Sequence, residues 1–260
     1  IYARGSTDNK GQHLAHLLGL GETLSENGDL PVNIIYLVEG EEEIGSPNLE
    51  PFLIENKEDL DCDVIAVSDT GMIGPGMGTF TYGLRGVACM EVKVIGPSKD
   101  LHSGVFGGAV ANPCTAISKM ISSLHDLDGR IKVDGFYDRV KEIEGWEKTA
   151  WAKIQLNENE TLDLTGAPEL FGETGFSDNE RRWSRPTAEV NGIGGGYQGE
   201  GSKTVIASES FVKLSFRLVP DQDPEEILNL VKDHFEQCKP KGVRVEYEMG
   251  HSGKAYLMDP

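Results

Sequence analysis

Three consecutive carboxylates, Glu41, Glu42 and Glu43, follow an apolar run at residues 32–38 that is rich in β-branched side chains. A run of this kind, ended by acids and glycine, predicts a buried strand whose carboxyl end carries the acids. Open α/β sheets hold their chemistry at that edge. A charge run is more often a solvated loop, but carboxylates held together at the mouth of a sheet repel one another unless a cation lies among them. The turn therefore favours a metal site if other ligands converge on it.

Two further acids are placed where such ligands would be. Asp69 ends a second apolar run at residues 63–68, which also predicts a buried strand, and Asp8 lies in a loop of small residues that leads into an expected helix. We expect Asp8, Glu43 and Asp69 to converge at one edge of the sheet. Their oxygen ligands suit Zn²⁺, Mn²⁺ or Mg²⁺, and the spacing does not select among these metals.

Histidine and cysteine add little to this site. His13 and His16 lie on the helix expected over residues 12–27, where a stripe of leucines favours half-buried histidines over metal ligands. The four cysteines are scattered without the spacing of a thiolate zinc site or a disulfide framework. This pattern favours a reducing, cytoplasmic setting.

The composition limits the kinds of partner. The 260 residues are enough for one large or two medium domains, and their 24 basic and 43 acidic side chains give a net charge of −19. Without a basic cluster, neither nucleic acid nor a membrane surface is an expected partner. No apolar stretch approaches the roughly 20 residues of a membrane span. The sequence begins at Ile1 with neither Met nor a signal peptide, so we expect it to be an internal part of a longer chain.

The sequence changes character after about Thr79. Residues 86–95 alternate apolar and polar side chains, which predicts a strand with one exposed face. Later segments predict two more strands and two helices on the same antiparallel sheet, a ferredoxin-like arrangement. The helices are expected at residues 113–127 and 224–238, and the strands at residues 210–218 and 243–248. Residues 134–183, which are aromatic and acidic, predict a helical insertion.

Six motifs, spread over nearly the whole sequence, resemble one family. They are RGSTDNKG (residues 4–11), EGEEEIGS (39–46), SD (68–69), DLHSG (100–104), GSKTVI (201–206) and SFRLVP (215–220). They are similar to the motifs of the dinuclear zinc peptidases that include carnosine dipeptidase, cysteinyl-glycine dipeptidase, aminoacylase and succinyl-diaminopimelate desuccinylase, and the match favours the dipeptidase branch. The resemblance implies an α/β fold, with part of a catalytic metal-binding domain at residues 1–80 and an inserted ferredoxin-like α+β lid and dimerisation domain at residues 81–260.

The resemblance also implies roles for the acids. Asp8 would bridge two divalent metal ions, with Glu43 binding one and Asp69 the other, and zinc is expected before manganese. Glu42 would be the general base that takes a proton from the attacking water. A cis peptide bond between Asp8 and Asn9 is a further implication.

Three residues of the lid resemble substrate contacts. His102 would stabilise the oxyanion of the tetrahedral intermediate and would come from the partner subunit of a homodimer formed through the lid. Thr204 would contact the substrate, and Arg217 would hold its terminal carboxylate, a task that suits a planar guanidinium. Apart from the resemblance, a surface ion pair is the more ordinary role for Arg217 on a strand.

The sequence departs from the family pattern at two metal ligands. The family's His-x-Asp motif before the bridging Asp and its histidine near the carboxyl end are not in these 260 residues, and His251 is a poor substitute. We therefore expect a metal-dependent dipeptidase whose isolated 260-residue chain is inactive. The alternatives are an N-acyl-amino-acid deacylase of the same family and a dimerising fragment without catalytic activity.

Overall fold

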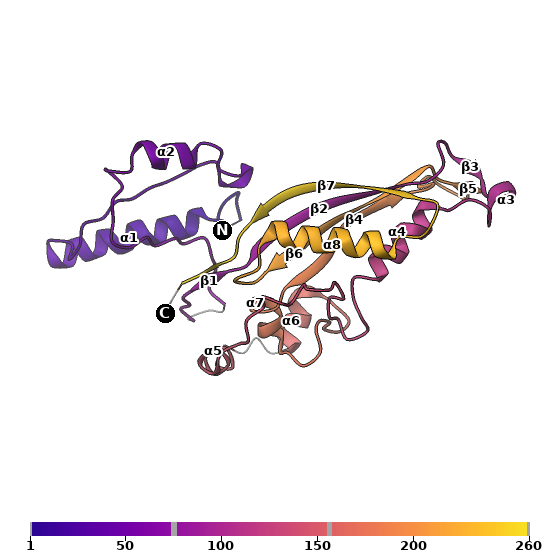
Figure 1. Cartoon of the computed structure of the whole chain (residues 1–260). Coiled ribbons are helices and arrows are strands. Elements are labelled where there is room, and N and C mark those ends of the chain that lie inside the picture. The colour runs from indigo at the N-terminus through magenta and orange to yellow at the C-terminus, as the bar shows by residue number, and fades with distance from the viewer. Residues whose placement is uncertain (1, 74–76, 155–157, 259–260) are drawn as a thin grey trace. The chain divides into compact units, whose positions relative to one another are not determined.

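The computed structural model describes residues 2–73, 77–154 and 158–258. Contacts within the chain divide it into two compact units, Ile1–Thr79 and Phe80–Pro260 (Figure 1). Among the described residues, no helix is both long enough and apolar enough to span a membrane.

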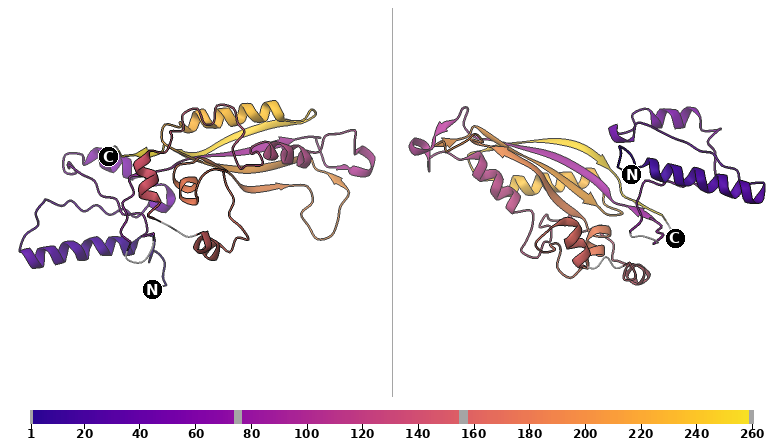
Figure 2. Two further views of the ribbon diagram at one scale, coloured as in Figure 1. Left: turned by 90° about the horizontal axis from the view of Figure 1, so that it is seen from below. Right: turned by 180° about the vertical axis from the view of Figure 1, so that it is seen from behind.

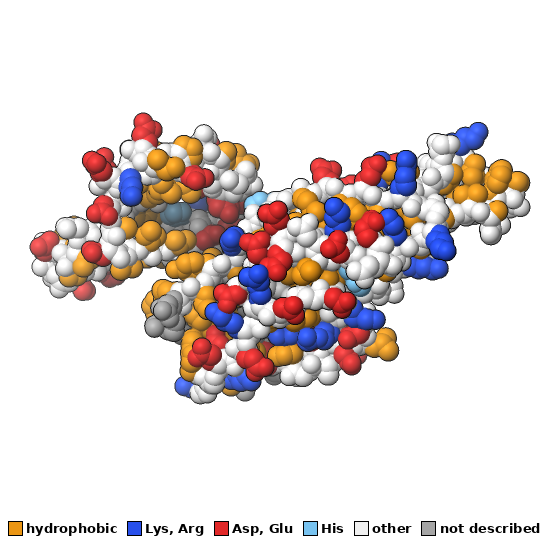
Figure 3. Space-filling model, in the orientation of Figure 1, with side chains coloured by type: hydrophobic (Ala, Val, Ile, Leu, Met, Phe, Trp, Pro, Cys, Tyr) orange, Lys and Arg blue, Asp and Glu red, His pale blue; other side chains and the backbone are white. Residues whose placement is uncertain are grey.

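The first unit contains α1 (Lys10–Asn27), the short 3₁₀ helix η1 (Glu42–Ile44) and α2 (Leu49–Glu55). Helix α1 ends at Gly28, whose φ of 75° lets its amide turn back to the carbonyl of Leu24, as glycine does at many helix ends. None of the described residues of this unit is buried. Exposed apolar side chains are consequently common on its surface (Figure 3).

The two buried strands expected in the first unit are not formed. Residues 32–38 and 63–69 form no strand, and they pair with no other segment of the described chain. A strand needs a neighbour to satisfy its backbone N–H and C=O groups and to cover its side chains. Without one, Val64 and Val67 keep 82% and 79% of their surface exposed. The prediction of two buried strands is therefore wrong for this structure.

The second unit is built on a four-stranded antiparallel sheet in the order β4-β6-β2-β7. Its strands are β2 (Gly86–Ile95), β4 (Thr187–Gly195), β6 (Glu209–Leu218) and β7 (Arg244–Gly253). Every second side chain of β2 and β6 is buried, as the alternation in the sequence predicts. The chain order of these strands and of the two long helices between them gives the expected ferredoxin-like connectivity.

Helices α4 (Pro113–Ser122) and α8 (Pro224–Cys238) pack against one face of the sheet (Figure 2). Both begin with proline behind a capping side chain, because Asn112 accepts a hydrogen bond from the amide of Cys114 and Asp223 accepts from the amide of Glu225. The core between sheet and helices holds large side chains such as Phe216. Helix α4 ends five residues earlier than expected, since the chain turns back there and the carbonyl of Leu124 accepts from the amide of Lys132.

The fourth strand, β4, is not among the predicted elements. Three of its nine residues are glycines, which weaken a strand pattern, and a bulge interrupts its pairing between Val190 and Gly192. The described part of residues 134–183 contains three short helices. The remaining elements are short: β1 (Gly83–Leu84), β3 (Leu101–His102), α3 (Ser103–Phe106), α5 (Gly145–Trp151), α6 (Glu158–Thr165), α7 (Asp178–Trp183), β5 (Val205–Ile206) and β8 (Tyr256–Leu257).

Candidate functional site

The loop that carries Asp8 is joined to the loop that carries Asp69. Asn9, the residue at the start of α1, donates from Nδ2 to the carbonyl oxygen of Ser68 at 3.3 Å and to Oδ1 of Asp69 at 2.9 Å. The peptide bond between Asp8 and Asn9 is cis, which confirms that implication of the resemblance. Asn9 thus connects two of the predicted ligand loops, a role that the sequence motif does not reveal.

The three carboxylates of the acidic turn differ in their contacts. Glu41 accepts hydrogen bonds from the backbone amide of Asn48 at 3.3 Å and from its Nδ2 at 2.9 Å, so it holds the turn together. Glu43 lies 3.2 Å from Nη2 of Arg4 in an exposed ion pair, which contributes little to stability. Glu42 is exposed, and its carboxylate makes no hydrogen bond or ion pair with any described residue.

The electrostatic surroundings of Glu42 connect all of the predicted acids. The pKa of Glu42 lies above its ordinary value, first because the protein removes part of its hydration and then because Asp69, Glu43 and Asp8 add negative charge around it. Each of these three carboxylates therefore lies within electrostatic reach of Glu42. Asp8, Glu43 and Asp69 are themselves exposed.

The donor chemistry fits a divalent cation. Carboxylate oxygens are suitable ligands for zinc and manganese, and a cation would relieve the repulsion that raises the pKa of Glu42. Within the part of the chain that the structure describes, no three His, Cys, Asp or Glu side chains already stand close enough to hold an ion. The structure thus brings Asp8, Glu43 and Asp69 into one neighbourhood without assembling them into a closed shell.

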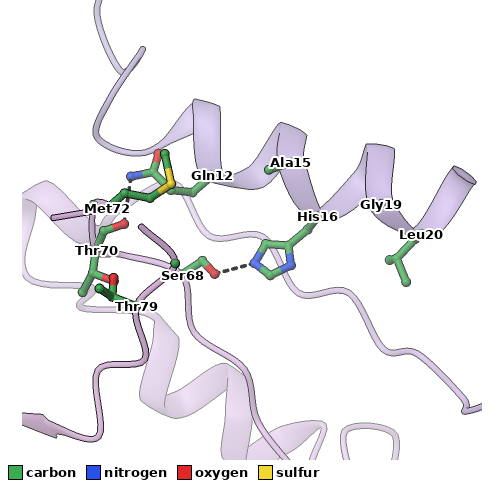
Figure 4. A pocket seen from close by; sticks show the side chains of 11 residues that line it. Gln12, Ala15, His16, Gly19, Leu20, Ser68, Thr70, Met72 and Thr79 are labelled. Atoms are coloured by element: carbon green, nitrogen blue, oxygen red, sulfur yellow. Dashed lines mark hydrogen bonds between the residues drawn. The ribbon is translucent and has the colours of Figure 1, made fainter. Parts of the chain in front are cut away.

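A hollow of about 550 Å³ lies in the first unit between α1 and the segments at residues 68–72 and 78–79 (Figure 4). None of its lining residues is acidic. His16 reaches across it, with Nε2 2.6 Å from Oγ of Ser68, and Nδ1 of His13 lies 3.1 Å from the hydroxyl of Tyr36. Both histidines are half-buried, but the leucine stripe does not face a core, because Leu14, Leu17 and Leu18 are all exposed.

In the second unit, His102 and Thr204 are brought together by two short paired strands. His102 pairs with Val205 in the ladder of β3 and β5, and Nε2 of His102 lies 3.3 Å from Oγ1 of Thr204. Nδ1 of His102 accepts a hydrogen bond from the amide of Gly104 at 3.0 Å. Both side chains are exposed at the tip of the unit, where β3, α3 and β5 meet (Figure 1).

Arg217 lies on β6 of the four-stranded sheet, near the end at which β2 begins. It pairs with Val87 on β2 and Thr187 on β4, and its exposed side chain alternates with core residues. No described carboxylate lies within 4.0 Å of its guanidinium, so the alternative of a surface ion pair is not formed. Burial lowers the pKa of nearby Arg85, and the positive charges of Arg217 and Arg182 lower it further. This local excess of positive charge suits an anionic group of a ligand.

Comparison with known proteins identifies the family. A family model described as the M20 peptidase dimerisation domain matches residues 82–243, more than half of the chain. The chain belongs to the M20 peptidase family. The family and the fold class predicted from the motifs are thereby confirmed.

Relatives within the M20 family are named as dipeptidases. The Cys-Gly metallodipeptidase dug1 of Schizosaccharomyces pombe is 34% identical over all of this chain, which covers 56% of that protein. The Beta-Ala-His dipeptidase of Homo sapiens is 34% identical over 93% of this chain, which covers 48% of it. In the structure of human carnosine dipeptidase 1, 99% of this chain matches 55% of that one at 31% identity, with a TM-score of 0.79. The chain thus spans about half the length of the M20 relatives it matches.

Proposed function

We propose that the protein carrying this chain is a metal-dependent dipeptidase that hydrolyses the amide bond of a dipeptide. The observation that carries the proposal is the gathering of Asp8, Glu43 and Asp69 around Glu42. It is supported by relatives that are named as metallodipeptidases. A free carboxylate surrounded by potential metal ligands is the arrangement that water activation requires.

Each of these acids would have a separate task. Asp8, Glu43 and Asp69 would hold two divalent ions, zinc in preference to manganese. When bound, such ions polarise the scissile carbonyl and lower the pKa of a water molecule to about 7. Glu42 takes the proton of the attacking water and returns it to the leaving amine.

The second unit would supply the substrate contacts. Arg217 holds the free carboxylate of the dipeptide through its guanidinium. His102 and Thr204 offer an N–H and an O–H to the oxygen of the scissile carbonyl, where negative charge develops. We include Thr204 among the substrate contacts because its hydroxyl lies beside the imidazole of His102.

His102 and Arg217 of one chain are too far apart to serve one dipeptide. Val87, the partner of Arg217, is eight residues from Ile95, which corresponds to about 26 Å along β2. The strands β3 and β5 lie beyond the Ile95 end. We therefore place the two residues of each site on different subunits of a homodimer. Exposed Val105 and Phe106 beside His102 give this tip an apolar surface that a partner subunit could cover (Figure 3).

The test measures the hydrolysis of Ala-Gly, Ala-Gly amide and N-acetylalanine by the protein that carries this chain. We expect hydrolysis of Ala-Gly, weaker hydrolysis of Ala-Gly amide, and loss of both when a chelator removes the metal. The variant Arg217→Ala should raise KM for Ala-Gly and leave that for the amide unchanged, because only the free dipeptide has a carboxylate to hold. Equal turnover of the two dipeptides by the unaltered protein would contradict the role of Arg217.

The same experiment also tests the alternative reaction, the hydrolysis of an N-acyl amino acid. N-acetyl amino acids are the substrates of an N-acyl-amino-acid deacylase, which would use the same acids. Preference for N-acetylalanine over Ala-Gly would replace the dipeptidase proposal by the deacylase. Absence of hydrolysis in the metal-loaded protein would favour a dimerising protein without catalytic activity.

A further inference from the structure

The imidazole of His102 receives a hydrogen bond that determines where its proton lies. The backbone amide of Gly104 can only donate, and it points at Nδ1 of His102 over 3.0 Å. A neutral imidazole has one protonated and one unprotonated nitrogen. Because Nδ1 accepts, the proton of the neutral ring must lie on Nε2.

The neighbouring hydroxyl is compatible with that tautomer. With the proton on Nε2, the imidazole can donate to Oγ1 of Thr204, which lies 3.3 Å away. The hydroxyl keeps its own hydrogen for another acceptor. The amide of Ser103 donates to the carbonyl of Thr204 at 3.1 Å, so the backbone fixes the two side chains next to each other.

Three further hydrogen bonds hold the base of the tip. Oδ1 of Asp100 accepts from the amide of Ser208 at 2.9 Å and from its hydroxyl at 3.1 Å. The amide of Gly96 donates to the carbonyl of Ser208 at 2.8 Å. These contacts keep β3 and β5 in the register that places Thr204 beside His102.

Residue 104 has to be small for the ring to occupy this position. A Cβ atom there would lie 2.9 Å from Cε1 of His102 and 3.2 Å from Nδ1. The backbone at Gly104 does not have a positive φ, so alanine is compatible with its conformation. The requirement for glycine is therefore the space above the imidazole.

We propose that Gly104 is a positioning residue, whose amide fixes His102 as the Nε2–H tautomer and whose missing side chain gives the ring its place. The catalytic consequence rests on the proposed function, in which Nε2–H donates to the developing oxyanion. The opposite tautomer would present a lone pair to that oxygen and repel it. The tautomer itself does not depend on any activity.

The direct test is the tautomeric state of His102 by long-range ¹H–¹⁵N correlation of the full chain labelled in histidine. At a pH where the ring is neutral, we expect a protonated Nε2 and an unprotonated Nδ1, assigned by the loss of these signals in His102→Gln. In Gly104→Ala, a population with the proton on Nδ1 should appear. A native ring protonated on Nδ1, or a Gly104→Ala ring unchanged from the native one, would overturn the proposal.

Two further variants separate Gly104 from its neighbours. Gly145→Ala, in the first turn of α5, adds a methyl group with no atom within 4 Å and should leave the His102 signals unchanged. A change there would mean that the signals report general disturbance, which overturns the proposal. Thr204→Val removes the hydroxyl but keeps the amide of Gly104, so Nε2 should stay protonated. A mixture of tautomers in Thr204→Val would mean that Thr204, and not Gly104, determines the tautomer of His102.

The kinetic test uses the protein that carries this chain with its metal. Gly104→Ala should lower kcat for Ala-Gly by a factor on the order of 10 to 10², with little change in KM, because misdirecting an oxyanion donor weakens transition-state binding. Gly145→Ala should keep kcat. If the tautomer changes and kcat does not, the role of His102 in the proposed function fails while the tautomer assignment stands. If neither changes, the positioning role of Gly104 fails.

Discussion

Glutamates that are neighbours in the acidic turn have different partners in the structure. Glu41 is hydrogen-bonded to Asn48, and Glu43 is paired with Arg4. Glu42 is exposed and is affected mainly by partial loss of hydration and by the charges of other acids. The type of side chain is the same in each case, so its partners decide whether a glutamate is structural or free for chemistry.

This difference leads to a prediction for Glu42. In the metal-loaded protein, Glu42→Gln should keep the metal content and lower kcat by a factor on the order of 10² or more, because an amide cannot accept and return a proton. Glu41→Gln is the matched control and should keep most of the activity, since an amide oxygen can still accept from Asn48. Metal analysis and dipeptide kinetics on both variants provide the measurement. An active Glu42→Gln protein would rule out this general base.

Sequence reasoning at the residue scale finds side chains whose chemistry is visible in a motif. It identified the acids that surround Glu42, and it linked His102 with Thr204 as substrate contacts. It did not identify Asn9 or Gly104, because an amide side chain and a glycine amide gain their roles only from what the folded chain places beside them. The glycine two residues after His102 is the signal that could have pointed to a close approach of backbone to ring.

At the scale of elements, the helical insertion is attached to the rest of the second unit by a buried ion cluster. Glu173 is 8% exposed and accepts two hydrogen bonds from Arg185, each of 2.8 Å. Arg130 donates to the same carboxylate at 2.7 Å, and its guanidinium lies 3.8 Å from the ring centre of Tyr137. This one carboxylate of the insertion therefore binds the segment before the insertion, at Arg130, and the segment after α7, at Arg185.

Removing this carboxylate should destabilise the insertion. Glu173→Gln leaves two guanidinium groups without their counter-ion, and breaking one partner of a buried ion pair costs about 3–5 kcal/mol. We expect an earlier transition in urea, followed by the fluorescence of the three tryptophans, all of which lie in the insertion. The control Glu226→Gln breaks an exposed pair with Arg139 and should change the transition little. Equal effects of the two variants would contradict the structural role of Glu173.

The cap of α8 gives a second prediction at this scale. Lys254 lies 3.1 Å from Asp223 and, with the amides at the start of α8, lowers the pKa of that carboxyl. Because the pKa of Asp223 is lower in the folded protein, its negative charge stabilises the fold at pH values above the ordinary pKa of about 4. This stabilisation is lost as the pH falls through the pKa of the folded state. Asp223→Asn should therefore lower Tm at pH 7, by an amount that shrinks below about pH 4. Asp233→Asn, on the exposed part of the same helix, is the control for thermal scans.

Elements with a complete local signal were predicted well. Strand β2 and helix α8 begin and end at the expected residues, since alternation and a proline behind a capping aspartate are both encoded locally. Strand β4 was missed because its glycines hide the pattern. The runs at residues 32–38 and 63–69 have a strand pattern, but pairing is a property of the neighbours and cannot be read from the run itself.

At the scale of the whole molecule, the two units differ in how much they bury. All of the described buried residues belong to the second unit, where the sheet and two helices enclose one core. In the first unit, acids and apolar segments are exposed alike. Local opening is easiest where few apolar contacts have to be broken.

Limited proteolysis should reveal this difference. In the 260-residue chain, we expect protease to degrade the region before about Thr79 first and to leave a resistant fragment that begins near Gly86, because only the second unit has a core of its own. Mass spectrometry of the products over time gives the cleavage sites. Addition of Zn²⁺ should slow the early cuts only weakly, since Asp8, Glu43 and Asp69 offer carboxylates without imidazole. Early loss of the second unit would contradict this order.

The separation of His102 from Arg217 within one chain has a consequence for genetics. If each site combines His102 of one subunit with Arg217 of the other, two variants that each hydrolyse dilute Ala-Gly poorly can repair each other. A dimer that pairs His102→Ala with Arg217→Ala would contain one site with both residues intact and one with neither. Random reassortment of equal amounts should thus restore about a quarter of the unaltered activity, since half of the dimers are mixed. Complementation of this kind would let two alleles, each defective alone, yield a working enzyme when they are expressed together.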